Sequence, residues 1–179
     1  MKTLAHKSRK GNEMTKIEFF YKETGKHIRN VQLLLNEVIR GLMLRARSHD
    51  ISKFDDAEKD LFVEATPDLD RLTYGSEAYK ESLRKLKPAL ERHYELNTHH
   101  PECFPNGIQG MCLMDLIEML CDWKAATKRH ADGDIYKSIE QNQKRFGYSD
   151  DLKQILINTM RQLESQNDLL EEHDKYIGE

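Results

Sequence analysis

Histidine and carboxylate side chains gather in the middle third of the chain. Four of the eight histidines, His49, His93, His99 and His100, fall there. Imidazole nitrogens and carboxylate oxygens together bind first-row divalent metals. Asp50 follows His49 directly, and in such a pair one side chain can bind an ion while the other bridges two ions. These residue types predict a metal centre, although one His-Asp pair alone is weak evidence.

Two histidines fall on the apolar faces of predicted helices. His27 shares a face with Val31, Leu34, Val38 and Leu42, and His93 continues the stripe of Leu83, Leu86 and Leu90. A histidine on an apolar face is expected to point inward, where it needs a polar partner. For either residue alone, a core histidine bonded to a carbonyl is the simpler interpretation. Two inward histidines favour a shared site.

Three acidic residues lie on one face of a helix predicted from Met111 to Lys128. They are Asp115, Glu118 and Asp122, spaced at i, i+3 and i+7. A solvated acidic face and a set of metal ligands are both compatible with this spacing. Each of the three carboxylates is therefore a candidate ligand.

Helical periodicity of apolar residues predicts the elements that position these side chains. Thr15 and Glu18 have the spacing of a capping box, and Thr24 offers a second helix start. A short helix over residues 55–64 should end before Thr66-Pro67-Asp68. A helix from Ser76 should kink or restart at Pro88.

The second half of the chain predicts further helices. After a loop over residues 101–110 come helices over 111–128, over 135–146 with Gly147 as its cap, and from Ser149 onward. No alternating strand pattern occurs in the sequence, so the predicted fold class is all-α. We expect a loose basic tail over residues 1–14 and one domain over residues 15–179.

Composition excludes several classes of partner. The chain has 179 residues, with 28 Lys and Arg against 31 Asp and Glu, and its net charge of −3 does not favour polymeric nucleic acid. Its apolar runs are too short to cross a membrane. The basic start lacks the apolar segment of a secretory signal, and the three cysteines suggest no disulfide framework. We therefore expect a cytoplasmic protein that acts on a small molecule.

The order of His27, His49-Asp50, Lys53, His93, His99-His100 and Asp122 resembles the HD-domain phosphohydrolase superfamily. The resemblance covers about Lys26 to Ala126. His49-Asp50-Ile51-Ser52-Lys53 is similar to the HDxxK motif, and His99-His100-Pro101-Glu102 is similar to the paired-histidine segment of the two-metal HD-GYP branch. The GYP signature itself is missing. The local runs over residues 48–54, 97–102 and 115–123 look like a small HD-like family of bacteria and phages.

The resemblance implies a helical bundle with two metal sites. His27, His49, Asp50 and Asp122 would hold the first ion, and Asp50 would bridge to a second ion held by His93, His99 and His100. Imidazole with carboxylate favours manganese or iron, with cobalt, nickel or zinc as alternatives. Lys53 would contact the phosphate of the substrate, and Arg45, Arg47 and Lys124 are weaker candidates for that contact.

The sequence therefore predicts a metal-dependent phosphohydrolase. It would cleave a phosphate ester, most readily of a nucleotide, by attack of a metal-bound water. Two alternatives stay open at this point. One is a non-catalytic helical bundle with a structural metal, and the other is a partner-binding bundle without metal.

Overall fold

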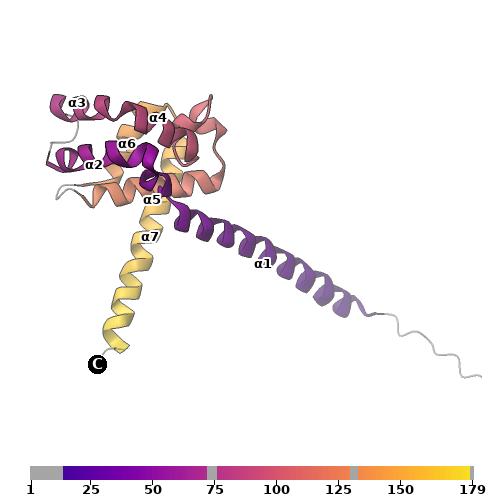
Figure 1. The fold of residues 1–179 in the computed structure, drawn as a ribbon. Helices are drawn as coiled ribbons and strands as arrows, with labels where there is room; N and C mark the ends of the chain where they lie inside the picture. Colours follow the sequence, from indigo (N-terminus) through magenta and orange to yellow (C-terminus); the bar gives the residue numbers. More distant parts are fainter. Residues whose placement is uncertain (1–13, 72–75, 130–132, 178–179) are drawn as a thin grey trace, which may run out of the picture. The chain divides into compact units, whose positions relative to one another are not determined.

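The computed structural model describes residues 14–71, 76–129 and 133–177, and these residues form seven α-helices, three short 3-10 helices and no strand (Figure 1). The predicted all-α class is confirmed. Among the described residues, no helix combines the length and apolar character that a membrane crossing requires. The elements in chain order are α1 (Lys16–Ser48), η1 (Ile51–Phe54), α2 (Asp56–Arg71), α3 (Glu77–Lys85), α4 (Lys87–Leu96), η2 (Pro101–Cys103), η3 (Gly107–Gly110), α5 (Leu113–Thr127), α6 (Ile135–Phe146) and α7 (Asp150–Ile177).

Helix α1 begins at the predicted capping box. The Thr15 amide donates to Glu18 Oε2 at 2.7 Å, and the Glu18 amide donates to Thr15 Oγ1 at 3.2 Å. The helix continues through Thr24, so the second start predicted there is wrong. Residues up to Met43 and residues from Leu44 onward form separate compact units, whereas the sequence predicts one domain over residues 15–179. The predicted tail lies almost wholly outside the described residues.

Helices α2, α3 and α4 pack against one another. The predicted end of α2 before Pro67 is wrong, since the backbone stays helical to Arg71. Packing of α2 against its neighbours offsets the hydrogen bond that a proline removes. The break predicted near Pro88 is confirmed, because α3 ends at Lys85 and Pro88 lies in the first turn of α4, where its missing N–H costs nothing.

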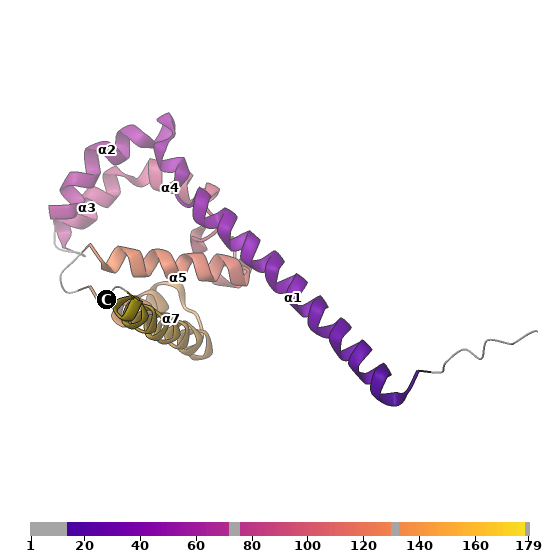
Figure 2. The same ribbon diagram turned by 90° about the horizontal axis from the view of Figure 1, so that it is seen from below.

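Helices α5, α6 and α7 surround the main hydrophobic core, and α6 contacts both of the others; α5 and α7 can be followed in Figure 2. The core residues are Leu120, Ile135, Ile139, Tyr148, Leu156 and Met160. Gly147, at φ 68°, ends α6 in the left-handed conformation that the sequence predicts. Ser149 Oγ accepts from the Leu152 amide at 3.2 Å and caps α7, again as predicted.

The segment between α4 and α5 carries His99 and His100. The sequence predicts a loop over residues 101–110, and the structure places two single-turn 3-10 helices in that range. These short turns contact each other, and η2 also contacts α4. The two histidines therefore stand at the start of a segment that is anchored to the rest of its unit.

Candidate metal centre

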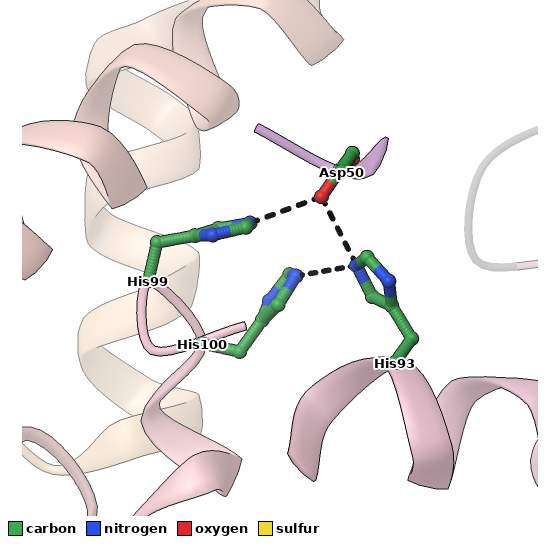
Figure 3. A group of neighbouring side chains, drawn as sticks. All are labelled: Asp50, His93, His99 and His100. Carbon is green, nitrogen blue, oxygen red and sulfur yellow. Dashed lines mark hydrogen bonds and ion pairs between the residues drawn. The ribbon is translucent and has the colours of Figure 1, made fainter. Parts of the chain in front are cut away.

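Four ligand side chains converge on one point, and we call them the inner group: Asp50, His93, His99 and His100 (Figure 3). Asp50 Oδ1 lies 3.2 Å from His93 Nε2 and 3.3 Å from His99 Nε2. His93 Nε2 lies 3.0 Å from His100 Nε2. Tetrahedral ligands at about 2.0–2.1 Å from a metal stand roughly 3.3 Å apart. The inner group is spaced as the ligand set of one ion.

Two buried atoms of the inner group lack a hydrogen bond. They are Asp50 Oδ1 and His99 Nε2, which face each other within 3.3 Å. His93 and His99 are only 1 % and 2 % exposed, so bulk solvent does not reach them. Buried polar atoms without a partner cost folding free energy and call for an explanation. A divalent cation bound between these atoms would satisfy both, and the residues present therefore fit a metal.

Asp50 reaches the inner group through an unusual backbone conformation. It has φ 55° in the turn between α1 and η1, and it is the only non-glycine residue with positive φ in the described part of the chain. Aspartate tolerates this left-handed region better than most residues, at a cost of about 1 kcal/mol. Burial raises the pKa of Asp50, but His93, His99 and Lys53 outweigh burial and hold that pKa well below its usual range. The carboxylate is ionised and available as a ligand.

His100 remains neutral at ordinary pH. Burial, assisted by the neighbouring His99 and His93, lowers the pKa of His100 to about 2. A neutral imidazole keeps a lone pair on one ring nitrogen. His100 can therefore offer a nitrogen ligand to a cation.

A second set of ligands, the outer group, consists of His49, Asp50 and Asp122 and so shares Asp50 with the first. His49 Nε2 lies 3.5 Å from Asp50 Oδ2 and 3.8 Å from Asp122 Oδ1. The side chains of His49 and Asp122 are 32 % and 29 % exposed, in contrast to the buried imidazoles of His93 and His99. The two oxygens of Asp50 thus face two ligand sets, of which the outer one is open to solvent.

Lys53 lies beside the outer group. Its Nζ donates to Asp50 Oδ2 at 2.6 Å and stands 5.5 Å from the centre of the Phe62 ring. The pairing follows from the chain itself, because Lys53 is three residues after Asp50 in η1. The structure therefore places Lys53, the residue predicted to contact the substrate phosphate, next to the outer group.

Glu118 is the third carboxylate at the centre. Its Oε1 lies 3.0 Å from His49 Nδ1 and 3.2 Å from His99 Nδ1, and these three residues form a further group that could hold an ion. Its Oε2 accepts from Arg45 Nη1 at 2.8 Å. Asp115, by contrast, accepts from the Cys112 amide at the start of α5 and belongs to none of the converging groups found among the described residues.

The three weaker candidates for phosphate contact have other surroundings. Arg45 pairs with Asp115 at 2.6 Å as well as with Glu118, so its guanidinium is held within the protein. Lys124 pairs with Glu164 of α7 at 2.5 Å. Arg47 is exposed in the last turn of α1. Neither Arg45 nor Lys124 extends freely toward a substrate.

His27 does not join the other ligands. It lies on the part of α1 that belongs to the unit ending at Met43, where its side chain is exposed, whereas the other predicted ligands lie in the unit from Leu44 onward. His27 is absent from the converging groups that the described residues form.

A buried polar network surrounds the other nitrogen of His93, and sequence reasoning missed it. His93 Nδ1 lies 3.3 Å from Ser52 Oγ and 3.5 Å from Glu58 Oε2, a carboxylate that is fully buried. Asn97 donates to Ser52 Oγ at 3.0 Å and to the His93 carbonyl at 2.7 Å. Ser52 and Asn97 stand within or beside the motif segments, but Glu58 carries no signal in the sequence. Contacts of this kind orient metal-ligating imidazoles.

Comparison with known proteins identifies the family of the chain. Residues 16–162 match the model of a family of unknown function (DUF5662). The chain belongs to this family. The matched range contains the inner group, the outer group and Glu118. No curated protein and no solved structure matches the chain.

Proposed function

We propose that the chain is a metal-dependent phosphohydrolase that holds two divalent transition-metal ions, one in the inner group and one in the outer group. The observation that carries the proposal is the position of Asp50, whose two oxygens face different sets of imidazoles. Mixed imidazole and carboxylate ligands without thiolates favour manganese or iron. The HD-like order of these residues along the chain supports the same function.

The outer group is where chemistry on a substrate fits best. Ions bound at the centre would lower the pKa of a water molecule and neutralise charge on a phosphoryl oxygen. The partly exposed side chains of His49 and Asp122 leave room for a small molecule to approach. Lys53, beside Asp50, supplies a positive charge that binds and orients a phosphate oxygen.

We propose a small phosphorylated substrate, with a nucleotide as first choice. The nearly balanced charge of the chain gives no large basic surface that a nucleic-acid polymer would need. We place this activity in the cytoplasm, where reducing conditions suit three free cysteines.

A structural metal is the alternative that one observation favours. The inner group offers four ligands, of which His93 and His99 are buried, and closed four-fold coordination is typical of metals that stabilise a fold without reacting. The outer group is what separates the two functions, since its ligands leave a metal accessible to solvent.

Metal analysis followed by a substrate screen tests the proposal. Protein purified without chelator should contain close to two ions per chain. With manganese added, it should hydrolyse at least one substrate among nucleoside monophosphates, deoxynucleotides, cyclic nucleotides and an aryl phosphate, whereas Asp50→Asn should hydrolyse none. A protein that retains metal but cleaves no phosphate ester would favour the structural role. If the protein holds no metal after mild purification and gains none on adding manganese or iron, both the hydrolase and the structural-metal proposals are defeated.

A further inference from the structure

We propose that Glu118 is a positioning residue that aligns one ligand of each metal site, an inference that rests on the metal centre of the proposed function. Its Oε1 lies 3.0 Å from His49 Nδ1 and 3.2 Å from His99 Nδ1. His49 belongs to the outer group and His99 to the inner group. One carboxylate oxygen therefore contacts a ligand of each group, on the side of each ring that faces away from Asp50.

The charges around Glu118 favour its role as a hydrogen-bond acceptor over a role as a metal ligand. Arg45 Nη1 lies 2.8 Å from Glu118 Oε2, and a guanidinium is permanently charged and would repel a cation placed beside it. The Nε2 atoms of His49 and His99 instead face Asp50, whose buried Oδ1 makes no hydrogen bond. An ion is therefore expected on the Nε2 side.

Hydrogen bonds from both rings to Glu118, of which the structure shows the one from His49 and a 3.2 Å contact from His99, would determine which nitrogen of each ring is free. When Nδ1 of His49 and of His99 donates its proton to Glu118, the Nε2 atom keeps a lone pair for the metal. Metal-ligating histidines commonly donate their second N–H to a carboxylate, which fixes the ring and raises its basicity. Glu118 would do this for two ligands at once.

Arg45 holds Glu118 in the required orientation. It stands in the last turn of α1, one helical turn before His49, and it bridges Glu118 and Asp115 at 2.8 Å and 2.6 Å. Binding Oε2 of Glu118 leaves Oε1 turned toward the imidazoles. The guanidinium thus acts on the metal centre through Glu118 rather than through a substrate phosphate.

Nitrogen NMR of the wild-type chain tests the orientation without any substitution at Glu118. Protein with 15N-labelled histidine is treated with chelator and studied at pH 8, with the rings assigned from His49→Gln and His99→Gln. We expect a proton on Nδ1 of both His49 and His99. An Nδ1 atom without a proton in either ring would overturn the inference.

Glu118→Gln tests the consequence for metal binding. The glutamine amide has two possible orientations. If its NH2 group faces the imidazoles, it donates to Nδ1, and the ring proton must then lie on Nε2. If its NH2 group faces Arg45 instead, two hydrogen-bond donors oppose each other. We expect the affinity for both manganese ions to fall about 10- to 100-fold. Glu91→Gln, which alters an exposed ion pair with Lys87, should leave both affinities unchanged.

The pattern of loss separates this inference from the proposed function. Wild-type affinity in Glu118→Gln, or loss of only one ion, would contradict a shared positioning role even if the protein hydrolyses phosphate esters. Wild-type protein that binds two ions but cleaves no phosphate ester would defeat the proposed activity and leave the role of Glu118 intact. If the wild type binds no metal, the ring protons alone decide whether Glu118 orients the two histidines.

Discussion

Lys53 Nζ and Asp50 Oδ2 lie 2.6 Å apart in the turn that follows α1. The same carboxylate oxygen faces His49 Nε2 in the outer group, at 3.5 Å. Without metal, the ammonium group neutralises Asp50 at the position where the outer ion is proposed to bind. We expect the ion to take over this role and leave the ammonium group for a phosphate oxygen.

The Lys53→Met variant should therefore retain both ions and the fold. Its rate of hydrolysis should fall on the order of 10²-fold, because one electrostatic contact to the reacting phosphate is removed. Turnover on the best substrate and metal content are measured on the same preparation. Lys59→Met is the matched control, since Lys59 pairs with Asp56 three residues earlier at 2.9 Å on an exposed surface. Equal turnover in the metal-replete Lys53 variant would remove this lysine from the site.

Metal binding should stabilise the native state. A ligand that binds only the native state, at about 100 times its dissociation constant, contributes about 2.7 kcal/mol. For a chain of this size, that corresponds to a rise in Tm of roughly 5–10 °C. Calorimetry with manganese, then with excess chelator, measures the gain and its reversal. Magnesium prefers oxygen ligands and should give a smaller shift, so an equal shift would argue against imidazole ligation.

Asp50→Asn should remove both ions, whereas His100→Ala should weaken chiefly the inner ion. Asp50 contacts both ligand groups and His100 contacts only one. Asparagine is the suitable replacement because it tolerates the left-handed backbone at φ 55°. Alanine would adopt that backbone only at a cost of about 1–2 kcal/mol. Titration calorimetry with manganese follows the two sites, and equal loss of both ions in the two variants would show that the sites are not separable.

Tyr148 should make the fold sensitive to alkaline pH. Its hydroxyl donates to the Ile139 carbonyl at 2.5 Å in the main core, and burial raises its pKa to about 12. The native state therefore disfavours the ionised ring, so the free energy of unfolding should fall as pH rises from about 10 to about 12. Tyr148→Phe should lose about 1 kcal/mol at neutral pH with the hydrogen bond and show less of this alkaline decline.

Urea unfolding at pH 8, 10 and 11 measures the effect, with Tyr21→Phe as the control at an exposed ring. A decline of equal slope in wild type and Tyr148→Phe would assign the alkaline sensitivity to other groups.

Local signals in the sequence anticipate most helix ends. Thr15 with Glu18, Gly147 and Ser149 mark their boundaries because each satisfies backbone groups within a few residues. Prediction of a helix end from the sequence fails where packing against residues distant in the chain determines the backbone conformation. Pro67 has the local character of a helix stop, but packing of α2 against α3 and α4 keeps the backbone helical.

The candidate site is predictable in its ligands and less so in their surroundings. The structure brings together His49, Asp50, His93, His99, His100 and Asp122, as the motif order predicts. Whether Arg45 pairs with Glu118 depends on side chains 73 residues apart, and Glu58 enters only because α2 packs beside α4. For His27, an apolar stripe on a helix does not reveal what covers it, so its place among the ligands stays a prediction.

The contrast between the buried His93 and His99 and the more exposed His49 has a kinetic consequence. An ion in the outer group would exchange readily with the buffer, whereas an ion held by the buried His93 and His99 would exchange more slowly. A chelator should then strip the centre in two phases, with a half-loaded chain persisting between them. The identity of the inner metal would then depend on the ions present when the chain folded, and that of the outer metal on the ions in the most recent buffer.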